Sequence, residues 1–386
     1  MYSRRVKQAL EGLQTPFYLY DMELLRRTVG AVVAASSPHG YKVHYAIKAN
    51  FERPIVAEII KAGLGVDCVS GNEVRYAIEQ GCPARSVVFA GVGKSDREIE
   101  YALQQGIFAF NCESRHELDV INEIAGRMGV VADVALRINP DVDPLTHKHT
   151  STGHADSKFG ISYKEVDEVV ERLPQLKNVR ITGLHFHIGS QITDLRVYEY
   201  LCRRANTLVA WFVERGFSFL HINLGGGLGI DYLSPDENPV PDFAAFFDIF
   251  ARNLELPAGL EVHFELGRSI VGQCGELISR VLYNKTTAEG TEVAIIDAGM
   301  TELIRPALYQ AVHSIENLSG EGRPEREYMI AGPVCESSDT FARGLRLSEL
   351  RRGDLVTLKS AGAYGTAMAS RYNMHDLPGS VYSDTL

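Results

Sequence analysis

An alternating series of short apolar runs and amphipathic stretches fills the sequence between Lys42 and Arg268. Each run has the length and β-branched character of one strand, and helical patterns such as Glu73–Glu79 and Ser114–Met128 lie between them. The predicted strands are Val43–Ile47, Gly65–Val69, Val87–Gly91, Ile107–Asn111, Val131–Ile138, Ile181–Ile188, Leu220–Leu224 and Leu260–Glu265. Eight strands in this order predict an α/β fold, a (β/α)8 barrel, since a doubly wound sheet has fewer strands and an early GxGxxG.

The chain after Arg268 has a different texture, with β-rich runs and little helical period. The opening run Pro16–Tyr20 is also strand-like, and we expect it to pair with that later region. The sequence therefore predicts a barrel over 22–268 and a mostly β domain from 1–21 plus 269–386. The later strands are expected at Glu276–Tyr283, Glu292–Ile296, Glu327–Ile330 and Leu355–Leu358.

The composition of the chain argues against some classes of binding partner. The 386 residues carry a formal charge of -10, which disfavours nucleic acid and anionic membrane as partners. No run approaches the roughly 18 apolar residues of a membrane span, and Met1–Leu10 lacks the apolar core of a signal peptide. The six cysteines form no CxxC pair, so neither a disulfide framework nor a zinc ribbon is indicated. We expect a cytoplasmic protein with mostly buried thiols.

Polar residues gather where the predicted barrel strands end, which is where barrel enzymes place their chemistry. They are Lys48, Asp67, Ser70, Arg137, His185, His187, Ser190, Gly225, Gly226, Gly227, Glu265 and Arg268. The long segment Asn139–Phe159 after the fifth strand interrupts the period, and we expect it to be a lid over the site.

Lys48 closes an apolar strand, so burial is expected to lower its pKa and make its amine a nucleophile; the alternative is a lysine that extends to solvent. The run Gly225–Gly227 exposes backbone N–H groups that suit a phosphate, as Ser190 and Arg268 also do, although a flexible turn would explain three glycines.

His185 and His187 share one face of a strand, so metal ligation is weighed against a packed histidine and a ring that stacks on a planar ligand. The cations at neighbouring strand ends argue against a metal. Glu265 either pairs with Arg268 or faces a heteroaromatic nitrogen. A nucleophilic lysine, a phosphate cradle, a stacking imidazole and a carboxylate for a ring nitrogen together match the needs of pyridoxal phosphate.

Eleven motifs carry a family resemblance that extends from Thr15 to Asn373. They are TPFYLYD, HYAIKAN, GVDCVSGNE, LRINPDVDP, SKFGI, LHFHIGSQ, NLGGGLGI, ELGRS, DAGMTELIRPALYQAVH, GPVCESSDTFA and SAGAYGTAMASRYN. In this order the chain resembles the pyridoxal-phosphate decarboxylases of the alanine-racemase-like barrel fold.

The resemblance implies roles for single residues. Lys48 would bind the cofactor covalently, His187 would stack on its ring, and Glu265 would keep the ring nitrogen protonated. Cys335 would be a proton donor that reaches the site of the other subunit of a homodimer. The other expected cofactor contacts are Asp67, Arg137, Ser190, Gly225, Gly226, Gly227, Gly267, Arg268 and Tyr364.

The resemblance also implies a substrate, meso-2,6-diaminopimelate, converted to L-lysine and carbon dioxide. Arg268, Arg305 and Tyr309 would clamp its distal carboxylate, Glu336 would bind its distal ammonium group, and Tyr364 would lie beside them. The alternatives are a decarboxylase of ornithine, arginine or a carboxylated polyamine, a homologue that only binds a partner protein, and a metal-dependent hydrolase. One departure is Leu266, where the family usually has proline in a turn.

Overall fold

The structure is a computed structural model and describes residues 9–140 and 157–386. The described chain divides into two compact units. One comprises the described residues of 29–229 and 242–270, and the other those of 1–28, 230–241 and 271–386. The sequence prediction placed 22–28 and 230–241 with the barrel and 269–270 with the β domain, whereas the contacts group 22–28 and 230–241 with the second unit and 269–270 with the first.

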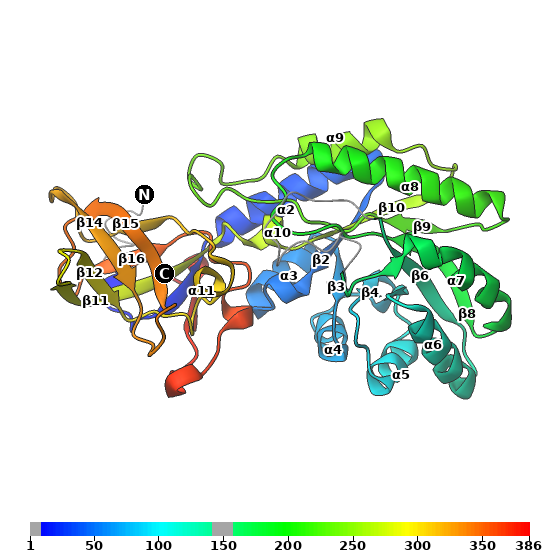
Figure 1. Cartoon of the computed structure of the whole chain (residues 1–386), viewed down its shortest axis with the longest axis horizontal. Helices are drawn as coiled ribbons and strands as arrows, with labels where there is room; N and C mark the ends of the chain where they lie inside the picture. Colours follow the sequence, from blue (N-terminus) through cyan, green and yellow to red (C-terminus); the bar gives the residue numbers. More distant parts are fainter. Residues whose placement is uncertain (1–8, 141–156) are drawn as a thin grey trace. The chain divides into compact units, whose positions relative to one another are not determined.

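The first unit is built on eight parallel strands that close into a barrel, which confirms the predicted fold (Figure 1). Each predicted strand has its counterpart, and the ring closes where β10 pairs with β2. In order around the ring, the strands are β2 (Lys42–Ala46), β3 (Gly65–Cys68), β4 (Val87–Phe89), β5 (Ala109–Cys112), β6 (Ala132–Asn139), β8 (Val179–His185), β9 (His221–Asn223) and β10 (Glu261–Leu266). The short β7 (Ile161–Ser162) pairs with β6.

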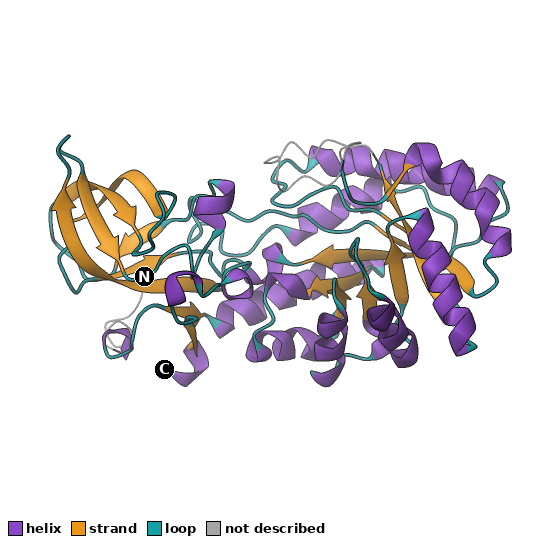
Figure 2. Ribbon diagram, turned by 60° about the horizontal axis from the view of Figure 1, so that its bottom comes forward, coloured by secondary structure: helices purple, strands orange, loops and turns teal. Residues whose placement is uncertain are grey.

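Helices cover the outside of these strands, as Figure 2 shows by colour. They are α3 (Arg53–Lys61), α4 (Gly71–Glu79), α5 (Asp96–Gln105), α6 (Arg115–Met128), α7 (Val166–Arg172), α8 (Arg196–Glu214) and α9 (Phe243–Asn253); α2 (Met22–Ser36) precedes the barrel and α10 (Arg268–Val271) follows it. None of the helices within 9–140 and 157–386 has the length and apolar character needed to cross a membrane.

Three consecutive helices begin with the same local signal, Ser-x-x-Glu. Ser70, Ser95 and Ser114 precede α4, α5 and α6, and a glutamate follows three residues later each time. The serine accepts from the glutamate's backbone N–H in α4 and α6, and a capping box is complete in α5. These caps satisfy N–H groups that the first helical turn leaves without partners, so the sequence sets the start of each helix locally.

Two strand predictions differ from the structure for identifiable reasons. The predicted strand Ile181–Ile188 runs past the end of β8, because Phe186 and Ile188 are buried and apolar although they lie outside the sheet. Leu266, expected in a turn, is the buried last residue of β10 and pairs with Tyr45.

The second unit is mostly β, as predicted. Its main sheet has the order β13-β16-β11-β12-β14-β15, and β1 (Phe17–Tyr20) joins it antiparallel to β11, which confirms the expected place of the opening run. The strands are β11 (Gly275–Thr286), β12 (Glu292–Ile296), β13 (Ile315–Asn317), β14 (Glu325–Ala331), β15 (Thr340–Ser348), β16 (Leu355–Leu358) and β17 (Gly379–Tyr382), and the short helix is α11 (Arg305–Tyr309). The sequence reading missed β13, β15 and β17; in β15, the exposed arginines and Gly344 with φ 65 obscure the apolar alternation.

Three histidines are buried together inside the barrel. His44 Nε2 and His263 Nδ1 are 2.9 Å apart, and the rings of His221 and His263 have centroids 5.0 Å apart. Gly65 and Gly183 leave room for them, since a Cβ there would overlap His44 and His221, respectively. Burial, with repulsion from His44, lowers the pKa of His221 to about 3 and that of His263 to about 2.

These histidines predict a loss of stability in mild acid. Below the ordinary histidine pKa of about 6.5, the unfolded chain binds protons that the folded chain does not, so the free energy of unfolding falls as the pH drops. For His221 the loss between pH 6.5 and pH 5 is about 2 kcal/mol. Urea unfolding at pH 7 and pH 5 measures it. We expect His221→Gln to show a smaller loss, whereas exposed His116→Gln should match the unsubstituted protein; equal losses in all three would contradict this account.

Candidate active site

Lys48 and Asp67 lie at the ends of the neighbouring strands β2 and β3. Lys48 Nζ is 3.5 Å from Asp67 Oδ2. The Lys48 side chain is 37% exposed to solvent, and the Asp67 side chain is 1% exposed. The lysine is therefore less buried than its position after an apolar strand suggested. Burial, and then the charge of Glu265, raise the pKa of Asp67 well above its usual range. Asp67 Oδ1 has no hydrogen-bond partner among the described residues.

The Glu265 carboxylate, in β10, has three hydrogen-bond partners among the described residues at this end of the barrel. Its Oε1 accepts from Asn111 Nδ2 at 2.9 Å and from Asn223 Nδ2 at 2.7 Å, and its Oε2 is 2.9 Å from His185 Nε2. Burial acts to raise the pKa of Glu265, but His185, His187 and Lys48 outweigh it, and the pKa lies well below its usual range. The pKa values of these two neighbouring carboxyl groups are thus shifted in opposite directions, that of Glu265 downward and that of Asp67 upward.

The glycine run follows β9 and touches His187. Gly226 N–H donates to His187 Nδ1 at 3.2 Å, which leaves the ring proton on Nε2. Burial, then the charges of Arg137 and Lys48, lower the pKa of His187 well below its usual range, so the imidazole is neutral. A Cβ at Gly226 would overlap the carbonyl oxygen of Glu265, and one at Gly225 would overlap that of Phe186. Only glycine fits this loop.

The predicted phosphate contacts also converge. Arg268 Nη2 donates to Ser190 Oγ at 3.1 Å, and the arginine is buried at the start of α10. The preceding Gly267 is packed against Ala46 and Ala49, where a Cβ would lie 3.1 Å and 3.2 Å from their Cβ atoms. The ends of β8, β9 and β10 therefore bring together Ser190, the glycine run and Arg268, as their positions in the sequence predicted.

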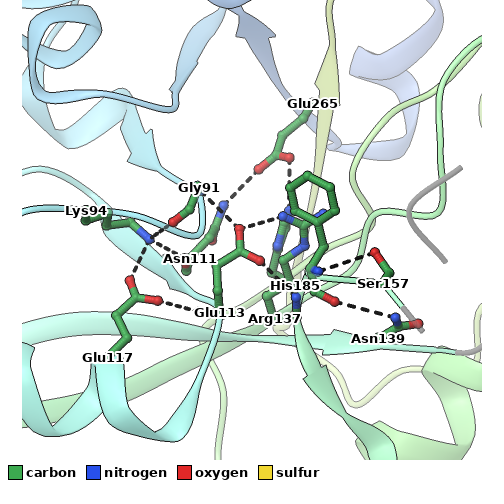
Figure 3. Close-up of polar contacts among 12 residues, drawn as sticks. Gly91, Lys94, Asn111, Glu113, Glu117, Arg137, Asn139, Ser157, His185 and Glu265 are labelled. Carbon is green, nitrogen blue, oxygen red and sulfur yellow. Dashed lines mark hydrogen bonds and ion pairs between the residues drawn. The ribbon is translucent and has the colours of Figure 1, made fainter. Parts of the chain in front are cut away.

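Arg137 in β6 belongs to a buried ion network (Figure 3). Its Nη1 donates to Glu113 Oε1 at 2.6 Å, and Glu113 also accepts from the backbone N–H of Gly91 at 3.0 Å and of Gly160 at 2.9 Å. The guanidinium lies 4.9 Å from the centroid of the Phe159 ring. Arg137 thus anchors the end of the segment expected to be a lid; residues 141–156 of that segment lie outside the described residues.

The network continues to Lys94, a buried lysine that the sequence analysis passed over. Its Nζ donates to Glu117 Oε1 at 2.6 Å and to the carbonyl oxygens of Gly91 and Asn111, each at 2.9 Å. Glu113, Asn111 and Asn223 were also missed. Their place at or just after the ends of barrel strands is the sequence signal that could have identified all three.

The second unit holds the remaining predicted residues. The guanidinium of buried Arg305, in α11, is 2.9 Å from His313 Nε2 and lies 4.7 Å from the centroid of Tyr232. Tyr309 ends the same helix and is half-buried. Tyr364 adopts a left-handed backbone with φ 57.

Cys335 and Glu336 lie side by side on an exposed loop of this unit. The backbone N–H of Cys335 donates to Asn373 Oδ1 at 3.0 Å, and Glu336 Oε1 accepts from the Tyr372 hydroxyl at 2.8 Å. All six cysteines are free, and Cys335 alone among them is exposed. Burial raises the pKa of others, for example that of Cys82 to about 11, so Cys335 is the thiol that a ligand can reach.

Comparison with known proteins identifies the family. The profile described as "Pyridoxal-dependent decarboxylase, pyridoxal binding domain" matches residues 25–272. The chain belongs to the pyridoxal-dependent decarboxylase family. It is 51% identical over 377 residues to the diaminopimelate decarboxylase of Bacteroides thetaiotaomicron, a match that covers 97% of each chain. It is 39% identical to that of Aquifex aeolicus, over 96% of this chain and 86% of the relative.

Among solved structures, the diaminopimelate decarboxylase of Helicobacter pylori complexed with L-lysine superposes with a TM-score of 0.89 and 34% identity, covering 99% of this chain and 94% of the other. As a member of this family, the chain is a decarboxylase that uses pyridoxal phosphate. No group of three or more His, Cys, Asp or Glu side chains within 9–140 and 157–386 is arranged to hold a metal ion.

The residues present fit pyridoxal phosphate. A loop in which only glycine is tolerated carries no side chains that would keep a phosphate away from its backbone, and the Arg268–Ser190 contact lies at the neighbouring strand ends. Lys48 keeps its amine accessible, Glu265 is ionised, and Asp67 Oδ1 is buried without a partner among the described residues. This donor set matches an aldehyde, a basic ring nitrogen and a phosphate.

The glycine loop gives a test of the cofactor site. Gly226→Ala would push a methyl group into the carbonyl oxygen of Glu265 and displace the loop, so we expect about ten-fold weaker binding of pyridoxal phosphate, equivalent to about 1.4 kcal/mol. Titration of the apoprotein, followed by absorbance, measures the dissociation constant. Gly30→Ala is the control, because no atom lies within 4 Å of its added Cβ. If Gly226→Ala binds pyridoxal phosphate with unchanged affinity, the glycine loop is not part of the cofactor site.

Proposed function

We propose that the chain decarboxylates meso-2,6-diaminopimelate to L-lysine and carbon dioxide, the last step of lysine biosynthesis. The observation that supports this substrate is the buried guanidinium of Arg305, which contacts His313 and Tyr232. A buried guanidinium whose position is fixed by such contacts suits a second carboxylate on the substrate. Free ornithine and free arginine lack that second carboxylate. The relatives named diaminopimelate decarboxylase, and the H. pylori complex with L-lysine, support the same substrate.

In this proposal the barrel residues hold the cofactor. Lys48 binds its aldehyde, Ser190, Gly225–Gly227, Gly267 and Arg268 receive its phosphate, and Tyr364 completes the phosphate contacts from the second unit. His187 covers the face of its ring, which suits a neutral imidazole. Bound pyridoxal phosphate supplies an electron sink for the electron pair that carbon dioxide leaves behind.

The remaining roles fall to charged and reactive groups. Glu265, which is ionised among its hydrogen-bond donors, keeps a proton on the ring nitrogen of the cofactor. Asp67, which contacts Lys48, and Arg137, fixed by Glu113, shape the site. Cys335 delivers a proton to the carbon that loses carbon dioxide, and its exposure leaves the thiol available for that step.

Substrate selection rests on the distal end of the molecule. Arg268, Arg305 and Tyr309 bind the distal carboxylate, and Glu336 binds the distal ammonium group. A charge-assisted bidentate contact contributes about 1.5 to 3 kcal/mol, which is roughly one to two decades of discrimination. A smaller amine leaves the buried cation without a counter-charge, so its rejection exceeds the loss of one contact.

A substrate panel tests this function. We expect carbon dioxide release from meso-diaminopimelate that depends on added pyridoxal phosphate, and roughly ten-fold or more lower kcat/KM with ornithine, arginine or a carboxylated polyamine. Arg305→Gln should lower kcat/KM for diaminopimelate by about ten- to hundred-fold. Exposed Arg343→Gln, in β15, is the control. Preferred turnover of ornithine or arginine would replace the proposed substrate, and no turnover of any amino acid would overturn the function.

We also propose a homodimer with composite active sites, in the cytoplasm. The proposed proton donor Cys335 and Glu336 lie on an exposed loop, next to exposed Tyr372 and Met374. Such a loop is available to enter the site of a second copy. Six free cysteines suit a reducing compartment.

Mixing two inactive variants tests the shared site. Lys48→Ala and Cys335→Ala should each lose nearly all activity, whereas exposed Lys42→Ala should keep it. After the two inactive variants exchange subunits, about a quarter of the activity should return, because half of the dimers are mixed and each mixed dimer holds one intact site. Activity in Lys48→Ala alone, or no recovery after proven exchange, would contradict the proposal.

A further inference from the structure

The Glu265 carboxylate is held by donors from three different strands, two of which, Asn111 and His185, are labelled in Figure 3. Asn111 of β5 and Asn223 of β9 both donate to Oε1, at 2.9 Å and 2.7 Å. His185 of β8 contacts Oε2 at 2.9 Å. Because a carboxylate oxygen accepts about two hydrogen bonds, Oε1 is saturated and Oε2 keeps one acceptor direction.

The contacts of Asn223 and His185 define which of their atoms face Glu265. Asn223 Oδ1 accepts from the backbone N–H of Gly225 at 2.9 Å, so its Nδ2 must face Glu265. His185 Nε2 faces an ionised oxygen and therefore carries a hydrogen. His185 Nδ1 is buried and has no hydrogen-bond partner among the described residues, so Glu265 is the contact that orients this ring.

We propose that His185 is a positioning residue that acts through Glu265, because its Nε2–H is the donor on Oε2 and aims the remaining acceptor direction of that oxygen at the ring nitrogen of the cofactor. The inference rests on the proposed role of Glu265. The asparagines cannot substitute for His185, since both contact Oε1.

The loss of His185 has a specific electrostatic consequence. Burial acts to raise the pKa of Glu265, and His185 is the strongest of the groups that lower it. Without this donor, Oε2 loses its contact with β8 and the carboxylate becomes easier to protonate. A protonated Glu265 no longer favours a proton on the ring nitrogen, so catalysis falls although Lys48 and the phosphate contacts remain.

The test is the protonation state of the ring nitrogen in the holoenzyme. Protein reconstituted with pyridoxal phosphate carrying ¹⁵N in the ring is examined by NMR, and kcat and KM are measured in parallel. We expect the ¹⁵N signal of His185→Leu and His185→Met to move toward the unprotonated position, with kcat lower by about ten-fold or more and KM changed less. His185→Gln, which places an N–H donor near the position of Nε2, should restore both.

The matched control is His221→Leu. His221 is an equally buried histidine on the adjacent strand β9, and neither of its ring nitrogens has a hydrogen-bond partner among the described residues. Its replacement alters packing without moving the ¹⁵N signal. If both apolar variants of His185 keep the unsubstituted signal and kcat, the inference is overturned.

Glu265→Gln separates this inference from the proposed function. If Glu265→Gln leaves the ¹⁵N signal unchanged, Glu265 does not face the ring nitrogen, and both the proposed role and the inference are wrong. If Glu265→Gln moves the signal and the two apolar His185 variants do not, Glu265 keeps its role and the inference alone is wrong.

Discussion

A buried, ionised carboxylate at Glu265 is the constraint on which the rest of the barrel site depends. Burial of a charge is costly unless hydrogen bonds and opposite charges compensate it. Here the compensation comes from Asn111, Asn223 and His185, which lie on three other strands. The barrel must close in the correct register for these donors to reach one side chain, so the site and the closure of the sheet support each other.

The same carboxylate sets the state of its neighbours. Its charge helps to raise the pKa of Asp67, and that carboxyl group lies beside Lys48. Asn223 connects Glu265 to the glycine run, and Gly226 orients the ring of His187. The contacts proposed for the phosphate, the ring and the aldehyde of one cofactor are therefore physically linked within the barrel.

A second polar network supports this centre from the side. Glu117 contributes to the start of α6 and also binds Lys94, and Glu113 connects Arg137 to Gly160. Local chemistry made part of this predictable, because the Ser-x-x-Glu signal is visible in the sequence. The pairing of Glu113 with Arg137 was not predictable, since their contact joins residues 24 positions apart across two strands.

The sequence by itself determined the eight barrel strands, the β-rich second region with its opening strand, the family, and the positions of Lys48, Glu265 and the glycine run, because strand period and strand-end chemistry are local. Tertiary structure alone decided the pKa values and solvent exposure of the charged groups. The lowered pKa of Glu265, the raised pKa of Asp67 and the partial exposure of Lys48 depend on donors and burial contributed by distant strands. Electrostatic free energies depend on distances and solvent access, and only the closed barrel defines them.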